Sequence, residues 1–476
     1  MTDAPRLTIE AIELYERPVH LRLPFRFGVV TLTHCPQAFA RVCVRLADGR
    51  SAWGAAAELM APKWFDKNLA LSNVDNFDQL RRSLLLARDA YLATGADTAF
   101  GHFAHHYQPL IEAGAAHGLN PLIACYGPAL VDRAVLDGMC RALDLSFYEA
   151  VRRNAPGIDA RLTPDLAGFD LPGFLGSLAP APTIDLRHTV GLVDPITAAD
   201  EHVSPHDGLP ETLQEVVAAT GCRWFKLKVS GKAGADLERL SRIAAVLKNV
   251  PNLRVTLDGN EQFANAAAAS AFWRQVLQTP SLQHLAAATL YIEQPLPRTT
   301  ALESDVRELA AMRPVLIDES DGTLQAFPRA LELGYTGVSS KQCKGVYRSL
   351  LNAARCRQRD QLAGQAGCFM SAEDLTTQAG LAVQQDLALV NLIGLTHVER
   401  NGHHYVDGFA GQGAGPAEAA AFLQAQPGLY EAAPNGNARL RVQGGLLDLR
   451  SLGAPGFATG THPNWASLQP LREPVA

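Results

Sequence analysis

Charged residues occur at regular intervals in the second half of the chain, each near the end of a short apolar segment. They are Lys226, Lys228, Asp258, Glu293, Asp318 and Lys341. From Lys228 to Lys341, successive members are 30, 35, 25 and 23 residues apart, which is about the length of one strand and one helix. Because a charged group in a buried strand is costly unless something compensates it, these positions are candidates for chemistry.

Three carboxylates at one place repel one another unless a cation neutralises them. Oxygen ligands of this kind favour Mg²⁺, with Mn²⁺ as the second choice. A lysine beside such an ion has its pKa lowered, which lets an amine act as a base near neutral pH. Two lysines can address two faces of one carbon. The pattern therefore predicts Mg²⁺-dependent removal of a proton next to a carboxylate, with the ion stabilising the enediolate.

The segments that carry these residues predict a barrel of the α/β class. Short apolar strands alternate with amphipathic segments from about residue 183, and this alternation indicates a parallel sheet. No GxGxxG follows the first strand, so we expect a barrel, whose active residues lie at the carboxyl ends of its strands. The predicted strands are 183–190, 223–229, 253–259, 290–295, 313–320, 336–343, 367–375 and 395–402.

The sequence on either side of the predicted barrel has a different pattern of strands and helices. Residues 6–60 read as strands, with a hairpin closing on Ala47-Asp48-Gly49 and a loop at 23–36. Helical patterns follow as far as residue 155. We expect an α+β domain at 1–155, the barrel at 183–425, and a segment at 426–476 that returns to the first domain through a hairpin at Gly444-Gly445.

Five motifs resemble those of the enolase superfamily, in its muconate-lactonizing-enzyme-like subgroup (the mandelate racemase/muconate lactonizing enzyme family). They are FKLKVSG at 225–231, LDGNEQF at 257–263, YIEQPLP at 291–297, LIDES at 316–320 and SSKQCKG at 339–345. The resemblance implies a (β/α)7-8 TIM-like barrel, closed by an N-terminal α+β capping domain that the C-terminal segment completes.

The same resemblance assigns roles to residues. It implies Asp258, Glu293 and Asp318 as metal ligands and Lys228 and Lys341 as the acid–base pair. Lys226 would support the enolate charge, and Asn260 and Glu319 would lie beside the ligands. A capping loop at 24–28 would contact substrate through Phe25, Arg26 and Phe27.

The last two predicted strands are the least informative about substrate. They lack the Asp-x-Asp that is typical of dipeptide epimerases and carry HVERNGHHY at 397–405 instead. Glu399, near the eighth strand end, is a candidate substrate-binding group, and the role of the histidines within 397–404 stays open. A His–Asp dyad of the mandelate-racemase type is disfavoured because Lys341 stands at the sixth strand end.

Several reactions share this set of residues. We favour a racemase or epimerase of a small carboxylic acid or amino-acid derivative. A lyase is the alternative: a dehydratase, an o-succinylbenzoate-synthase-like enzyme or a cycloisomerase. A catalytically inactive metal-binding relative would keep the three carboxylates but would not need both lysines.

The composition of the chain indicates which binding partners and which cellular location to expect. The chain has 476 residues and a net charge of −6, with no basic patch for nucleic acid. It has no apolar run of about 18 residues for a membrane and no signal peptide. Its eight cysteines form no CxxC pair. We therefore expect a cytoplasmic enzyme that binds a small-molecule carboxylate, and the resemblance implies a homo-oligomer.

Overall fold

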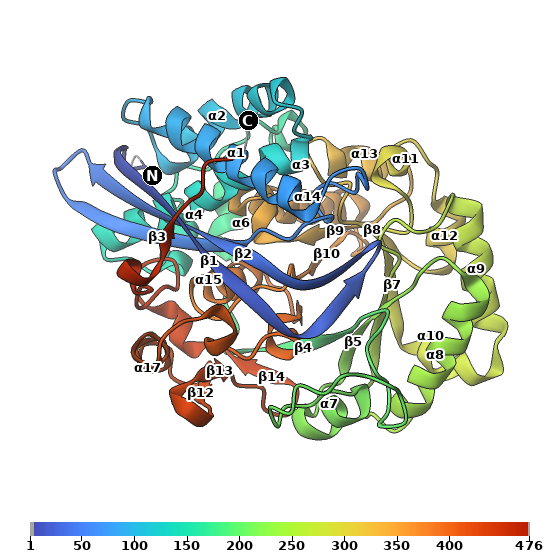
Figure 1. The fold of residues 1–476 in the computed structure, drawn as a ribbon. Helices are drawn as coiled ribbons and strands as arrows, with labels where there is room; N and C mark the ends of the chain where they lie inside the picture. The colour runs from blue at the N-terminus through green and yellow to red at the C-terminus, as the bar shows by residue number, and fades with distance from the viewer. Residues whose placement is uncertain (1–3, 475–476) are drawn as a thin grey trace.

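Eight parallel strands close into a barrel in the computed structural model, which describes residues 4–474 (Figure 1). They follow one another in chain order, and the last pairs with the first. This confirms the predicted barrel, including its seventh and eighth strands. The strands are β4 (Thr183–Val190), β5 (Trp224–Lys228), β6 (Arg254–Asp258), β7 (Thr289–Glu293), β8 (Val315–Ile317), β9 (Gly337–Ser340), β10 (Phe369–Ala372) and β11 (His397–Arg400).

Helices cover the outside of the barrel because each turns one apolar face toward the strands. In α8, for example, the buried residues Leu240, Ile243, Ala244 and Leu247 follow the i, i+3, i+4, i+7 spacing of one helix face. The helices after β4 are α7 (Leu213–Thr220), α8 (Ala233–Leu247), α9 (Ala266–Gln278), α10 (Gln283–Ala288), α11 (Arg298–Ala301), α12 (Arg307–Met312), α13 (Ala326–Glu332), α14 (Val346–Ala363), α15 (Leu381–Leu392), α16 (Gly402–Tyr405) and α17 (Pro416–Ala425).

An antiparallel sheet and a group of helices precede the barrel (Figure 1). The strands are β1 (Leu7–Phe27), β2 (Val30–Leu46) and β3 (Ser51–Leu59). The helices are α1 (Asn73–Leu92), α2 (Ala99–Ala116), α3 (Pro121–Ala124), α4 (Tyr126–Leu143), α5 (Phe147–Arg152) and α6 (Leu171–Ser177). The α4 helix packs against β3 and β2.

The predicted loop at 23–36 is wrong, because β1 and β2 continue through it. They meet at a two-residue turn, with Phe27 paired to Val30 and Gly28 at a positive φ of 48°. Glycine and aromatic residues suggested a loop, yet Phe25, Phe27 and Leu32 are buried at alternate positions of a long ribbon. This ribbon carries the capping residues across to the barrel (Figure 1).

The C-terminal segment contains β12 (Tyr430–Ala432), β13 (Ala438–Leu440), β14 (Leu446–Asp448) and β15 (Gln469–Pro470). Gln443 and Leu446 form an antiparallel bridge around the predicted turn at Gly444-Gly445, but the pairing does not continue into a longer hairpin. The β13 strand pairs with β12, whereas β14 runs antiparallel to the start of β4. A local turn signal cannot reveal that a distant strand offers unpaired backbone groups. The β15 strand pairs with β1.

A buried ion pair joins the α4 helix to the N-terminal sheet. Arg133 of α4 donates to Glu58 at 3.0 Å, and both side chains are at most 1% exposed. Arg133 also donates to Gln342, next to Lys341. Burial raises the pKa of Glu58 to about 7, although Arg133 opposes this shift.

We predict that Arg133→Met lowers the free energy of unfolding by about 3–5 kcal/mol, since it leaves a buried carboxylate without its partner. Urea denaturation at pH 8 measures this change. Adding Glu58→Gln should recover most of the loss, because the uncompensated charge is then removed. Arg153→Met, which breaks a pair that is largely exposed, should change stability by less than about 1 kcal/mol. An equal loss in Arg133→Met and Arg153→Met would contradict the prediction.

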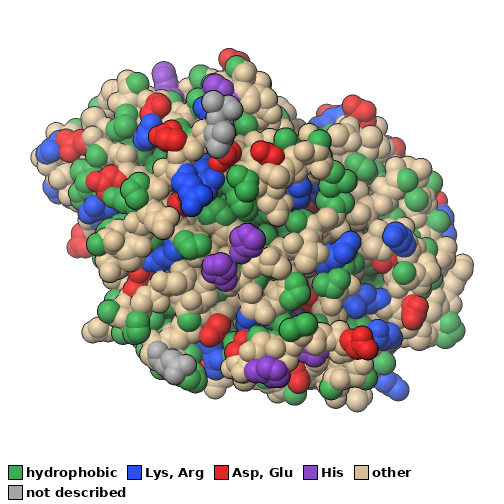
Figure 2. Space-filling model, in the orientation of Figure 1, with side chains coloured by type: hydrophobic (Ala, Val, Ile, Leu, Met, Phe, Trp, Pro, Cys, Tyr) green, Lys and Arg blue, Asp and Glu red, His purple; other side chains and the backbone are tan. Residues whose placement is uncertain are grey.

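Among residues 4–474, no helix has the length and the apolar character that a membrane crossing requires. On the face drawn in Figure 2, acidic and basic side chains are interspersed.

Candidate active site

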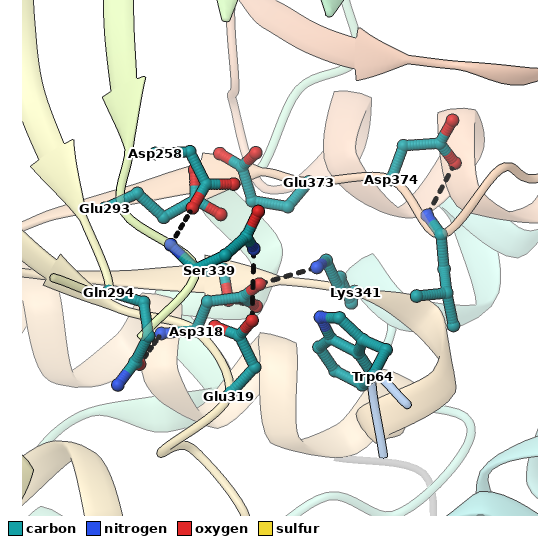
Figure 3. Close-up of polar contacts among 12 residues, drawn as sticks. Trp64, Asp258, Glu293, Gln294, Asp318, Glu319, Ser339, Lys341, Glu373 and Asp374 are labelled. Atoms are coloured by element: carbon teal, nitrogen blue, oxygen red, sulfur yellow. Dashed lines mark hydrogen bonds and ion pairs between the residues drawn. The ribbon is translucent and has the colours of Figure 1, made fainter. Parts of the chain in front are cut away.

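Strand register brings the predicted residues together at one end of the barrel (Figure 3). Lys228 pairs with Asp258 across β5 and β6, and Asp258 pairs with Glu293 across β6 and β7. Asp318 follows β8, and Lys341 follows β9. Lys228 and Lys341 stand four strands apart in an eight-stranded barrel, so they approach the mouth from opposite sides. All five side chains are buried.

Lys226 is surrounded by carboxylates. Its Nζ lies 2.8 Å from Glu293 Oε1, 2.8 Å from Glu373 Oε2, 2.9 Å from Asp258 Oδ2 and 3.0 Å from Glu399 Oε2. Burial lowers its pKa, but the four carboxylates outweigh burial and hold the pKa well above the ordinary value. Lys226 is therefore a fixed positive charge at this place.

The two flanking lysines each contact one carboxylate. Lys228 Nζ is 2.5 Å from Asp258 Oδ2, and Lys341 Nζ is 2.5 Å from Asp318 Oδ2. The indole ring of Trp64 lies over Lys341, with 4.3 Å from Nζ to the ring centroid. Burial lowers the pKa of Lys341, whereas Asp318 raises it, and the net direction is upward. The predicted lowering of a lysine pKa depends on a neighbouring divalent ion and stays a prediction.

The carboxylates share one mouth but do not converge on one point. Asp318 is engaged by Ser339, Lys341 and Lys344. Among residues 4–474, no three His, Cys, Asp or Glu side chains form a group that could hold a metal ion. In this arrangement ammonium groups lie against the oxygens of the predicted ligands.

Glu293 nevertheless has two properties that are typical of a metal ligand. Its Oε2 is buried and has no hydrogen-bond partner. Burial, together with the charges of Asp258 and Glu373, raises its pKa well above the ordinary value. A carboxylate in this position gains from a nearby cation. The donor set consists of carboxylate oxygens alone, which is the chemistry that Mg²⁺ prefers, so the residue types fit such an ion, although their spacing in this structure does not bring them to one point.

The predicted supporting residues lie beside this set. Asn260 Nδ2 donates to Glu319 Oε1 at 3.2 Å, and the Asn260 backbone N–H donates to Asp258 Oδ1 at 2.8 Å. Gln294, which sequence reasoning missed, accepts from the Asp318 backbone N–H at 2.7 Å and so ties the end of β7 to the end of β8.

Glu373 and Arg187 were also missed. Glu373 follows β10 and bonds both Lys226 and Arg187, and Arg187 on β4 also donates to Tyr291 and Ser371. The strand-end rule that identified Asp258 would have found Glu373 as well. Glu373 stands at the end of the seventh predicted strand, within residues 367–375.

A small pocket lies above the two flanking lysines. It is lined by Phe25, Phe27, Ala61, Trp64, Lys228, Lys341, Asp374, Leu375, Thr376 and Asn401. Phe25 and Phe27 therefore lie where the resemblance implies.

Two other candidates do not line this cavity. Arg26 is exposed, because alternate residues of a strand point to opposite faces. Glu399 lies inside the barrel, where it accepts from Thr189 at 2.5 Å and from the Asp374 backbone N–H at 2.8 Å. The prediction that Arg26 and Glu399 contact substrate is not supported by this geometry.

The loop that carries Trp64 is fixed to the barrel by charged contacts. Arg298 donates to the carbonyls of Trp64 and Phe65 at 2.6 and 2.8 Å and pairs with Glu261 at 2.9 Å. Lys67 also pairs with Glu261, at 2.6 Å. These bonds determine where the indole sits over the site.

The histidines of 397–404 lie away from the cavity. His397 stacks on Trp224, and His403 and His404 pack against His188. Burial lowers the pKa of His403 to about 4, so this group is neutral near pH 7.

Comparison with known proteins agrees with this geometry. Residues 208–429 match the family model described as enolase C-terminal domain-like. Similar structures include the L-Ala-D/L-Glu epimerase of Bacillus subtilis (15% identity, TM-score 0.57, covering 94% of this chain and 98% of that one). A dipeptide epimerase of Enterococcus faecalis, solved with Mg and a dipeptide, has 14% identity and a TM-score of 0.58, with 95% and 99% covered.

A muconate lactonizing enzyme of Mycobacterium smegmatis has 15% identity and a TM-score of 0.56, with 96% and 98% covered. No curated protein matches the chain. Residues 208–429, which contain β5 to β11, are therefore similar to the enolase C-terminal domain, and this match agrees with the resemblance of the motifs.

Proposed function

We propose that the site removes and returns a proton next to a carboxylate, with Asp258, Glu293 and Asp318 holding Mg²⁺ or Mn²⁺. The observation that carries this proposal is the placement of Lys228 and Lys341 on opposite sides of these carboxylates. When bound, the ion supplies positive charge that neutralises the carboxylates and favours negative charge on the substrate's own carboxylate. The match to the enolase superfamily supports an enzyme of the isomerase or lyase class.

Each residue of the proposed site has a separate role in the reaction. One flanking lysine removes the proton from one face of the carbon, and the other delivers a proton to the opposite face. Lys226, held by four carboxylates, adds fixed positive charge below the reacting group. Phe25 and Phe27 cover the cavity and exclude water. The favoured reaction is racemisation or epimerisation of a small carboxylic acid or amino-acid derivative.

A lyase is the second candidate, and the contact between Trp64 and Lys341 favours it. An aromatic face 4.3 Å from the Lys341 ammonium stabilises the protonated form, which is the form that donates a proton to a leaving group. The alternatives within this class are a dehydratase, an o-succinylbenzoate-synthase-like enzyme and a cycloisomerase. The inactive relative is disfavoured because both lysines face the cavity.

Deuterium exchange tests this proposal. A panel of carboxylates is incubated in D₂O with the Mg²⁺-loaded protein, and the α-proton signal is followed by NMR. We expect loss of the signal for at least one acid, arrest of the loss by EDTA, and recovery when Mg²⁺ is restored. Exchange that continues in EDTA, or no exchange by a protein that binds Mg²⁺, would contradict it.

A further inference from the structure

Two cysteines meet beside the start of the seventh barrel strand. Cys356 lies on α14 and Cys368 immediately precedes β10, and their Sγ atoms are 3.1 Å apart. Both are free thiols in this structure. Among residues 4–474, no other two cysteines form a hydrogen bond with each other. The contact joins two separate elements, because α14 packs against β10 (Figure 1).

The helix and the loop that follows it hold the two sulfur atoms together. Cys356 and Asp360 are four residues apart on α14, so they share one face of the helix. Asp360 Oδ1 accepts from the backbone N–H groups of Gly367 and Cys368 at 3.0 and 2.9 Å. These bonds bring Cys368 back to the helix face that carries Cys356. The next residue begins the pairing of β10 with β9.

The two thiols differ in their access to solvent. Cys356 is 8% exposed, whereas Cys368 is partly exposed and follows an exposed loop at 364–367. The hydrogen bond with Cys368, together with burial, raises the pKa of Cys356 well above the ordinary thiol value. Cys368 is therefore the thiol that a small molecule reaches, and Cys356 is the thiol placed to react with Cys368.

The pair lies at the opposite end of β10 from the candidate active site. Cys368 precedes β10, and Glu373, which bonds Lys226, follows it. A reagent can therefore reach Cys368 without entering the pocket above the lysines. Chemistry at the cysteines can be measured independently of the reaction proposed for that pocket.

We propose that Cys356 and Cys368 form a reversible disulfide, and that a small-molecule disulfide is the oxidant. The Cys368 thiolate attacks one sulfur of that molecule, forms a mixed disulfide and releases one small thiolate. The Cys356 thiolate then attacks the Cys368 sulfur and releases the second. Two protein thiols are oxidised and one small disulfide is reduced. The two protons leave the protein sulfurs and end on the two released thiols.

The new bond fastens α14 to β10. A disulfide joins sulfur atoms about 2.05 Å apart, so two thiols 3.1 Å apart need to approach by only about 1 Å. The bond closes a loop of 368 − 356 = 12 residue steps, which restricts separation of the strand from the helix. In a reducing compartment the pair stays open, and it closes when small-molecule disulfides accumulate.

Oxidised glutathione is the probe that tests this proposal. After incubation, free thiols are alkylated and the full chain is digested for mass spectrometry. The wild-type protein should carry a Cys356–Cys368 cross-link that dithiothreitol reverses. Cys356→Ser should instead hold glutathione on Cys368, at a level about tenfold or more above that of the wild-type protein, because no second thiol displaces it.

Cys43→Ser is the matched control. Cys43 is also partly exposed, but its sulfur contacts Glu10 and not another cysteine. This variant should form the Cys356–Cys368 cross-link to the wild-type extent. The proposal is overturned if wild-type Cys368 retains glutathione as Cys356→Ser does, or if both thiols stay free in folded protein while the urea-unfolded chain is oxidised. The wild-type result decides the matter if a variant fails to fold.

Hydrogen exchange tests the mechanical effect of the bond. The Gly367 and Cys368 amides, which Asp360 accepts, should exchange about tenfold more slowly in oxidised than in reduced protein, because local opening is restricted. Cys368→Ser should show no difference between the two conditions. Equal exchange in oxidised and reduced wild-type protein would overturn the claim that the bond fastens α14 to β10.

Discussion

Lys341→Ala should abolish α-proton exchange from one enantiomer of a substrate and leave exchange from the other enantiomer within about threefold. The affected enantiomer should lose at least about a hundredfold in rate, the usual contribution of a positioned acid or base. Lys228→Ala should give the reverse pattern. The reason is geometric: the two ammonium groups reach the cavity from strands on opposite sides of the barrel. Exchange of each pure enantiomer in D₂O, followed by NMR, gives the two rates.

Lys232→Ala is the matched control for these variants, because Lys232 lies close to Lys228 in the chain but is exposed. It should exchange both enantiomers at the wild-type rate. Asp318 keeps its contacts with Lys344 and Ser339 when Lys341 is removed, so Mg²⁺ affinity should stay within about tenfold. If either lysine variant lost both exchanges equally while it retained the fold and Mg²⁺ affinity, two bases on two faces would be excluded.

Glu293→Gln should lower Mg²⁺ affinity by at least about a hundredfold and make exchange undetectable. The amide keeps the shape of the side chain but removes the charge of the one predicted ligand with a buried, unpartnered oxygen. The free energy of unfolding without metal should rise or stay unchanged, because the substitution relieves repulsion from Asp258 and Glu373. Calorimetric Mg²⁺ titration and urea denaturation in EDTA measure the two effects.

Glu319→Gln is the matched control for Glu293→Gln. Glu319 is equally buried and also has one oxygen without a hydrogen-bond partner, but its other oxygen bonds Asn260 and it is not a proposed ligand. Its Mg²⁺ affinity should fall by about tenfold or less. Wild-type Mg²⁺ affinity in Glu293→Gln, or an equal loss in both variants, would refute the assignment of Glu293.

The positions of the chemical groups were predictable because a parallel barrel converts sequence spacing into position. Asp258 and Glu293 fall one strand–helix unit apart, and the strand register places them side by side. The same logic placed Lys341 opposite Lys228. Such a prediction requires no knowledge of side-chain contacts, because the position of each residue depends only on where its strand ends.

Contacts between distant segments were not predictable. The four carboxylates around Lys226 come from four strand ends, and their combined field decides the direction of its pKa. Local composition likewise cannot tell that β14 pairs with β4. The exposure of Arg26 was predictable from alternation, but only if residues 23–36 had been read as strand rather than loop.

Anomalous diffraction from crystals grown with Mn²⁺ tests the central claim most directly. The account predicts one Mn²⁺ peak at the barrel mouth, about 2.0–2.3 Å from one oxygen each of Asp258, Glu293 and Asp318. Lys228 and Lys341 should flank it on opposite sides. An ion bound elsewhere, or no peak at millimolar Mn²⁺ with Lys226 still between Asp258 and Glu293, would contradict it.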